Sequence, residues 1–365
     1  MKLSELINER TLSYPAIENG DWEATRKKWA DTIIGLQYGP LPEKPDSLRF
    51  IQYGYDIPIL NGKAVFRKIL VCGTHPNMPG GFSFPIQVIC PAQKKNVPYF
   101  VHLSFTPDAF FNDVVSLRSG TQVHDITPVE EIIDRGFGLI DLWYEDVTAD
   151  TDDFSDGAAP VAGPRTKDSA GKLAIWAWAM QRCVDYAEST EDFAKNKAIA
   201  VGHSRLGKTA LIAGVTDTRF GGVISNESGC GGAAPYLHKE GESLSWITGK
   251  FPFWFRERFL EYQDREEALP YDQQFMIACI APRLCVISSA EKDNWSDQKG
   301  EMASCLLASG IYEALGLPGF IGEDKLPEPG DAFTEGLLCY YMRSGVHDLL
   351  AEDWLHFLDA CEKLK

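Results

Sequence analysis

The chain has 365 residues, of which 44% are hydrophobic and 24% charged, and it carries a net charge of −17. These proportions are ordinary for a folded globular protein, and no apolar run reaches the ~18 residues that a membrane span needs. Because a negative protein repels polyanions, nucleic acid and membrane partners are not expected, whereas small neutral or sugar-like ligands remain open.

Residues 1–50 are predicted to form an extension packed on a main domain that spans 51–365, since no linker-like change of composition divides the chain. Residues 1–10 lack the apolar stretch of a secretory signal. The nine cysteines show neither CxxC nor Cys/His ligand spacing. These features favour a cytoplasmic protein with reduced cysteines, and no metal and no cofactor are predicted.

Short apolar runs alternate with helical patterns along the main domain. Eight runs predict strands, at 68–72, 85–90, 99–103, 136–142, 198–201, 222–225, 284–288 and 336–341. Periodic apolar positions predict helices at 172–186, 300–308 and 354–361. Strands that alternate with helices indicate a mainly parallel sheet covered on both faces, so the predicted fold class is α/β.

The segment 198–213 predicts a strand, a sharp turn and a helix, with Ser204 at the turn. Such a turn leaves little room beside its apex, and Gly202 and Gly207 stand two residues before and three residues after the serine. This arrangement is typical of a nucleophilic serine, although the second glycine usually stands two residues after it. The alternative is an ordinary strand-to-helix junction in which Ser204 caps the helix.

A nucleophilic serine needs a base, and His347 is the candidate. In α/β-hydrolases the order along the chain is serine, acid, histidine, each after a different strand. His347 follows the predicted strand 336–341, whereas His356 lies inside the last predicted helix. The alternative for His347 is a structural histidine that is hydrogen-bonded to its turn.

Two acids compete for the role of orienting this base. Glu227 follows the predicted strand 222–225 in a glycine-rich segment, and Asp293 follows the predicted strand 284–288. The alternative for each is a solvated loop carboxylate. That alternative is weaker for Glu227, because a charge at a buried strand end needs a partner.

Two motifs stand 23 residues apart, measured from Ser204 to Glu227: GHSRLGK at 202–208 and NESGCGGAA at 226–234. Further segments that match the same known family lie at 241–243, 251–255, 269–274, 280–283, 295 and 347–348, and upstream at 132–138. Together they resemble the glucuronoyl esterases of carbohydrate esterase family fifteen, which cleave the ester that joins glucuronate on xylan to lignin alcohols. The resemblance covers most of the chain and implies an α/β-hydrolase fold.

The resemblance also implies catalytic roles. Ser204 is then the nucleophile, His347 the base and Glu227 the usual acid, while Asp293 occupies the alternative acid position. Arg205 stabilises the oxyanion through its backbone N–H and its guanidinium.

For the sugar, the resemblance implies that three residues hold the glucuronate hydroxyls and ring: Lys208, Glu242 and Trp295. The alternative is that Lys208 makes a local cap or ion pair and that Trp295 belongs to the core.

The implied activity is that of a serine carboxylesterase, which hydrolyses a 4-O-methyl-glucuronoyl-type ester through an acyl-enzyme. Its partner would be a small-molecule or oligosaccharide ester. A short-chain or acetyl-sugar esterase of the acetylxylan type would use the same triad. A third possibility, from another class, is a carbohydrate-binding homologue that has lost turnover.

Overall fold

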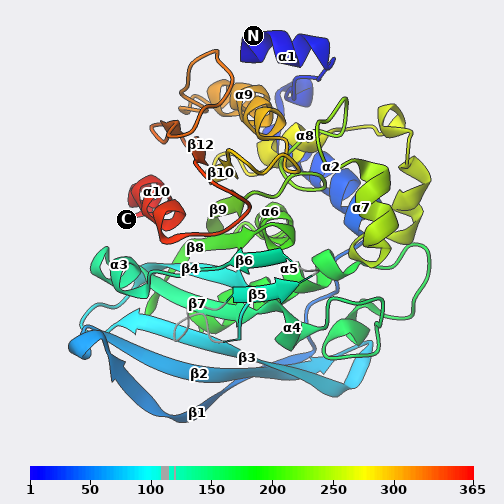
Figure 1. Ribbon diagram of the computed structural model, residues 1–365. Helices are drawn as coiled ribbons and strands as arrows, with labels where there is room; N and C mark the ends of the chain where they lie inside the picture. The colour runs from blue at the N-terminus through cyan, green and yellow to red at the C-terminus, as the bar shows by residue number, and fades with distance from the viewer. Residues whose placement is uncertain (108–114, 119–120) are drawn as a thin grey trace.

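The computed structural model describes residues 1–107, 115–118 and 121–365. Its centre is a ten-stranded sheet with the order β1-β2-β3-β7-β4-β8-β9-β10-β12-β11 (Figure 1). The central strands, each parallel to its neighbours from β7 to β12, are β4 (Val97–Ser104), β7 (Gly138–Trp143), β8 (Phe193–His203), β9 (Phe220–Asn226), β10 (Leu284–Ala290) and β12 (Leu338–Arg343). The predicted α/β class is confirmed.

Both edges of the sheet are antiparallel. One edge is a meander of β1 (Ser47–Ile59), β2 (Ala64–His75) and β3 (Met78–Pro91), and the other is β11 (Ala332–Phe333). A separate pair is formed by β5 (Val115–Arg118) and β6 (Thr121–His124). The sequence analysis missed β1, because this strand is largely exposed and carries Gly54 and Pro58, which strands usually avoid.

Alternate side chains of the parallel strands meet helices on opposite faces of the sheet. In β8, Ala198 and Ala200 belong to one core cluster, and Ile199 and Val201 belong to the other. The first cluster includes α5 (Lys172–Glu188), α6 (Arg205–Thr216), α8 (Gln273–Ala278) and α9 (Gln298–Ala314); the second includes α3 (Val129–Asp134) and α10 (Ala351–Cys361). Strands that are buried on both faces read as continuous apolar runs, which is why they were predictable.

The amino-terminal residues pack on the first of these clusters. Helices α1 (Leu3–Glu9) and α2 (Trp22–Ile33) bury leucine, isoleucine and tryptophan side chains in it, and α1 lies beside α9 (Figure 1). Strand β1 begins at Ser47, so the predicted boundary at residue 50 falls inside a strand. The short helices α4 (Tyr144–Val147) and α7 (Leu244–Lys250) complete the α-helices of the described residues.

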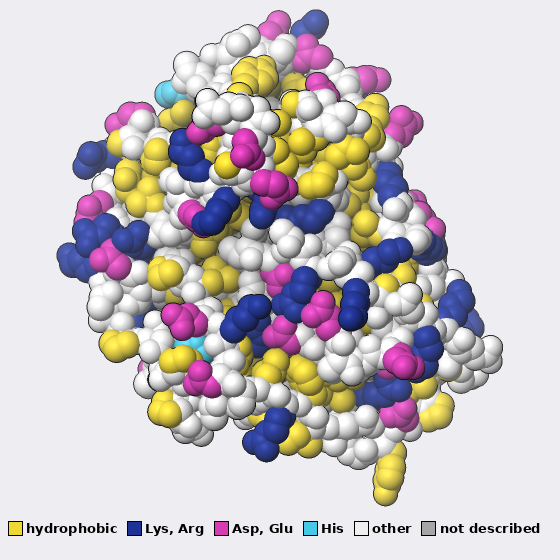
Figure 2. Space-filling view, turned by 180° about the vertical axis from the view of Figure 1, so that it is seen from behind, with side chains coloured by type: hydrophobic (Ala, Val, Ile, Leu, Met, Phe, Trp, Pro, Cys, Tyr) yellow, Lys and Arg dark blue, Asp and Glu magenta, His cyan; other side chains and the backbone are white. Residues whose placement is uncertain are grey.

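Among the described residues, no helix combines the length and apolar character that crossing a bilayer requires. All nine cysteines lie within the described ranges as free thiols, eight of them buried. On the face seen in Figure 2, basic side chains are interspersed with acidic ones. On this face, positive charge is distributed among acidic side chains and not concentrated in one patch.

Candidate active site

Ser204 lies at the sharp turn between β8 and α6. Its backbone has φ 56° and ψ −125°, a conformation that costs free energy for any residue other than glycine and that persists where the surroundings hold it. Its N–H donates to the carbonyl of Asn226 at 2.8 Å, which ties the turn to the end of β9. Its hydroxyl makes no capping hydrogen bond to α6, a helix that is described in full. The turn therefore presents this hydroxyl instead of using it as a helix cap.

The two glycines of this turn are required by close backbone approaches. A Cβ atom on Gly202 would lie 2.2 Å from the carbonyl oxygen of Leu206. A Cβ atom on Gly207 would lie 3.0 Å from the carbonyl oxygens of both Gly202 and Asn226. The glycine three residues after the serine thus gives the room that the usual pattern provides one position earlier.

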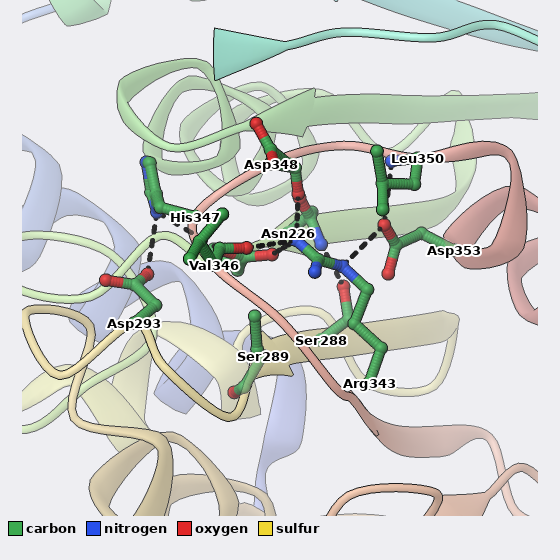
Figure 3. A network of polar contacts seen from close by, with 12 residues as sticks. Asn226, Ser288, Ser289, Asp293, Arg343, Val346, His347, Asp348, Leu350 and Asp353 are labelled. Carbon is green, nitrogen blue, oxygen red and sulfur yellow. Dashed lines mark hydrogen bonds and ion pairs between the residues drawn. The ribbon is translucent and has the colours of Figure 1, made fainter. Parts of the chain in front are cut away.

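His347 follows β12 and meets both predicted acids, and its contact with Asp293 is seen in Figure 3. Its Nδ1 lies 2.7 Å from Asp293 Oδ2 and 3.1 Å from Glu227 Oε2. Ser204, Glu227, Asp293 and His347 follow β8, β9, β10 and β12, which are successive neighbours in the sheet. Because the carboxyl ends of parallel strands meet at one edge, the fold brings all four side chains to one cavity.

The two carboxylates differ in how they are held. Asp293 accepts the hydrogen bond of His347 (Figure 3), whereas Glu227 Oε1 accepts one from Arg343 Nη2 at 2.7 Å. Glu227 Oε2 has no hydrogen-bond partner among the described residues. The sequence analysis placed Glu227 first and Asp293 as the alternative. In this structure the hydrogen bond with His347 is made by Asp293, the alternative of the two.

The pKa values of the two acids also differ, and they shift in opposite directions. Burial raises the pKa of Glu227, and the opposing contacts with His347 and Arg343 do not cancel this effect. Burial is the largest influence on Asp293 and would raise its pKa, but the hydrogen bond and charge of His347, together with contacts to Ser296 and Glu227, outweigh burial and hold that pKa below its usual value. Asp293 is therefore the carboxylate held ionised beside the imidazole.

The imidazole of His347 remains accessible, with 32% of its side chain exposed. Burial favours its neutral form, but the contacts with Asp293 and Glu227 outweigh burial and raise its pKa above 6.5. The ring of buried His203 packs 4.4 Å from it, measured between centroids. Burial and the neighbouring His347 lower the pKa of His203, so its ring is a neutral support. His203 Nδ1 is fixed at 2.5 Å from Asn226 Oδ1.

Arg205 begins α6 immediately after the serine, so its backbone N–H belongs to the positive end of a helix. Its guanidinium forms an ion pair with Asp150 and lies over the rings of Trp254 and Phe251, at 4.6 and 5.4 Å from their centroids. The Nε1 of Trp254 also donates to Asp150 at 2.7 Å. The cation is thus held in the wall of the cavity beside Ser204.

The predicted sugar-binding residues line the same cavity, which has a volume of about 470 Å³. Lys208 is buried on α6 with its Nζ 3.9 Å from Glu242 Oε2. Burial lowers the pKa of Lys208 and raises the pKa of Glu242. Trp295 is 55% exposed, so it is a rim residue and not part of the core, and its ring centroid lies 5.0 Å from that of Trp246.

Comparisons with known proteins point to one family. The family model described as "Glucuronyl esterase, fungi" matches residues 125–316. A 4-O-methyl-glucuronoyl methylesterase of Schizophyllum commune is 34% identical over 315 residues, which cover 83% of this chain and 71% of that protein. The chain belongs to the glucuronoyl esterase family. The solved structure of a glucuronoyl esterase from Solibacter usitatus shares the α/β-hydrolase fold of this family member, with a TM-score of 0.84 and 29% identity over 96% of this chain and 95% of that one.

A carbohydrate esterase of an unknown prokaryotic organism is 38% identical over 231 residues, which are 62% of this chain. This glucuronoyl esterase family member thus spans about half the length of that curated relative, namely 53%.

Sequence reasoning missed three residues of this family member's site: Asp150, Trp246 and Arg343. Arg343 is the last residue of β12, and its position at a strand end was a usable signal. Asp150 and Trp246 reach the site from a loop and from α7, and no local pattern marks them. All three act on groups that the sequence did identify: Asp150 on Arg205, Trp246 on Trp295 and Arg343 on Glu227.

Glu227, Asp293 and His347 each offer a ligand atom within 4.8 Å of the others, a spacing that a metal site would also need. Arg343 already places a positive charge on Glu227, and this charge would repel a cation bound next to it. Nδ1 of His347 is already engaged by Asp293. The donor set therefore fits a catalytic triad better than a metal site.

Proposed function

We propose that this protein is a serine carboxylesterase that hydrolyses uronate esters of the 4-O-methyl-glucuronoyl type through an acyl-enzyme. One observation carries the proposal: Ser204, at its positive-φ turn, shares a cavity with the His347–Asp293 pair and with the pair of buried Lys208 and half-buried Glu242. The first pair activates a nucleophile. The second offers charged hydrogen-bonding groups to a polar acyl group.

The chemistry follows from the positions of the atoms. Because Nδ1 of His347 is occupied by Asp293, Nε2 is the nitrogen left to take the Ser204 proton. The Ser204 oxygen attacks the ester carbonyl, and the backbone N–H and guanidinium of Arg205 stabilise the oxyanion. His347 then gives its proton to the departing alcohol. Water attacks the acyl-enzyme by the same route and releases the uronate.

The sugar of the ester would lie against the other wall of the cavity. Lys208 and Glu242 have the donors and acceptors that ring hydroxyls need, and neither is exposed enough for water to satisfy it fully. Trp295, at the rim, can cover an apolar sugar face. This arrangement suits esters between glucuronate on xylan and an alcohol, since the acid, and not the alcohol, is the recognised part.

A hydrolysis panel tests the proposal. Benzyl and methyl glucuronate are compared with acetylated xylose and 4-nitrophenyl acetate, with Ser204→Ala as the control for each. We expect kcat/KM to be highest for the glucuronate esters. Preferential hydrolysis of acetylated xylose would make the protein an acetyl-sugar esterase, and sugar binding without turnover of any ester would make it a binding protein.

A further inference from the structure

A residue of the amino-terminal extension reaches the loops that carry Glu242 and Trp295, two of the predicted sugar-binding residues. Arg10, at the end of α1, is only 3% exposed. Its guanidinium donates two hydrogen bonds to Asp297, with Nη1 2.5 Å from Oδ2 and Nη2 3.2 Å from Oδ1. Nη2 also lies 3.6 Å from Glu240 Oε1. One buried cation thus joins two segments that are far apart in the sequence.

These two segments present the sugar-facing side chains. Glu240 stands two residues before Glu242, and Asp297 stands two residues after Trp295. The segments also pack closely against each other: Glu242 N–H donates to the carbonyl of Trp295 at 3.2 Å, and a Cβ on Gly241 would lie 2.1 Å from the carbonyl oxygen of Asn294. Movement of either segment therefore moves the other.

Asp297 depends on Arg10 for its place. It is buried, has a positive φ of 61° and accepts the N–H of Gly300 at 3.1 Å as the cap of α9. A buried carboxylate that loses its cation is destabilised until it reaches water. If Arg10 were removed, Asp297 would turn outward, and Trp295 and Glu242 would shift with it.

We propose that Arg10 is a positioning residue, which sets the distance between Glu242 and Trp295 across the mouth of the cavity. The amino-terminal extension then contributes to substrate recognition. The identity of the recognised group as a uronate rests on the proposed function; the positioning of the two loops does not. Arg10 contacts no residue of the triad. Asp293 lies in the same loop as Asp297, but it is anchored separately, by its N–H to the carbonyl of Ala290 at 3.1 Å and by its hydrogen bond with His347.

Kinetics of Arg10→Met give the first test. We expect kcat/KM for benzyl glucuronate to fall by about tenfold, the loss expected when Trp295 no longer covers the sugar. Hydrolysis of 4-nitrophenyl acetate, which has no sugar, should stay within about twofold of the wild-type rate. Arg10→Lys keeps the charge and should recover part of the loss. Equal losses on both esters would overturn the proposal.

Arg182→Met is the matched control. Arg182 is also a buried arginine in an ion pair, with its Nε 2.5 Å from Asp185 Oδ2, but it lies on α5 and does not line the cavity. It should lower stability without the split between the two esters. A similar split in this control would show that Arg10 acts through general stability, which contradicts the proposal.

Hydrogen exchange provides a readout that does not depend on activity. In Arg10→Met, the amides of Glu242 and Gly300 should exchange faster than in the wild type, while the amide of Ser204 should keep its protection. Asp297→Asn weakens the pairing with Arg10 but retains the helix cap, so it should speed exchange at Glu242 and leave Gly300 protected; it serves as the second variant if Arg10→Met does not fold. Unchanged exchange at Glu242 and Gly300 would overturn the positioning role. Absence of uronate esterase activity in the wild type, together with faster exchange in Arg10→Met, would overturn the proposed function alone.

Discussion

The two walls of the cavity are built in different ways. The proposed catalytic wall consists of Ser204, His347 and their acids, each one to four residues past the end of a neighbouring strand of the central sheet. The recognition wall consists mainly of Glu242, Trp295 and Trp246, which come from loops and from α7. A wall built on strand ends inherits the rigidity of the core, whereas a wall built on loops needs additional contacts to hold it.

This difference implies that the two walls can be damaged separately. Changes in the catalytic wall should lower the turnover of every ester by a similar factor. Changes in the recognition wall should lower the turnover of uronate esters and spare esters without a sugar.

The largest effect is expected for Ser204→Ala. Removal of the nucleophile should lower kcat by at least ~10⁴-fold for both benzyl glucuronate and 4-nitrophenyl acetate, because the triad acts as a unit. Steady-state kinetics measure this loss, and circular dichroism checks that the fold is kept. If a tenth of the wild-type activity remained, Ser204 would not be the nucleophile.

The second-largest effect is expected for Asp293→Asn, and it distinguishes the two candidate acids. Asp293→Asn should lower kcat by about 10³–10⁴-fold, because the amide no longer stabilises the imidazolium or fixes its tautomer. Glu227→Gln should cost clearly less, because its carboxylate is held mainly by Arg343. The reverse order would assign the triad acid to Glu227, in line with the sequence resemblance.

The pH profile tests the same assignment. His347 must be neutral to act as a base, so kcat/KM should fall as the pH decreases through its pKa, which Asp293 and Glu227 hold above 6.5 despite burial. Asp293→Asn removes part of this stabilisation of the charged form, so the acid limb should move to lower pH. An acid limb that stays in place in Asp293→Asn would contradict the role of Asp293.

Arg205→Ala should have an intermediate effect. Its backbone N–H is kept, but the guanidinium held by Asp150 is lost, and kcat should fall by about 10²–10³-fold with a smaller change in KM. The measurement uses both esters, and the loss should be similar for each. A raised KM with unchanged kcat would show that Arg205 only binds the substrate.

A smaller and selective effect is expected for the recognition wall. Trp295→Ala should lower kcat/KM for benzyl glucuronate by about tenfold, the effect of losing one exposed aromatic contact, and should leave 4-nitrophenyl acetate unchanged. Lys208→Met should show the same selectivity. Equal losses on both esters would place these residues in the fold or in the triad.

The smallest effect is expected from a metal chelator. Because Arg343 already supplies positive charge to Glu227, incubation with EDTA should leave kcat/KM unchanged. Loss of activity that returns on addition of a divalent cation would identify the cluster of Glu227, Asp293 and His347 as a metal site.

The structure brings the residues predicted for both walls to one cavity, but the sequence signals for the proposed catalytic wall are more local. The turn at Ser204 needs its glycines locally, and His347 follows a strand whose apolar run is visible in the sequence. Both signals are short-range. The order of Glu227 and Asp293 was not predictable, because it depends on a difference between 2.7 and 3.1 Å set by the packing of three strand ends.

The contacts that hold the recognition wall are long-range. Arg10 is separated from Asp297 by 287 residues, and no local pattern marks a buried arginine as a partner of a particular carboxylate. The strand β1 was missed for a related reason, since its exposed side chains show no buried face. Sequence patterns report local needs of the backbone, whereas these pairs appear only once the chain is folded.

The central claim, a uronoyl-enzyme on Ser204, is tested most directly by partitioning. Several glucuronate esters with different alcohols are hydrolysed in the presence of added ethanol, and the ratio of ethyl glucuronate to free glucuronate is measured. We predict the same ratio for every leaving alcohol, because all would pass through one acyl-enzyme that ethanol and water share. A ratio that changes with the leaving alcohol would mean that water attacks the ester directly, which would contradict the mechanism.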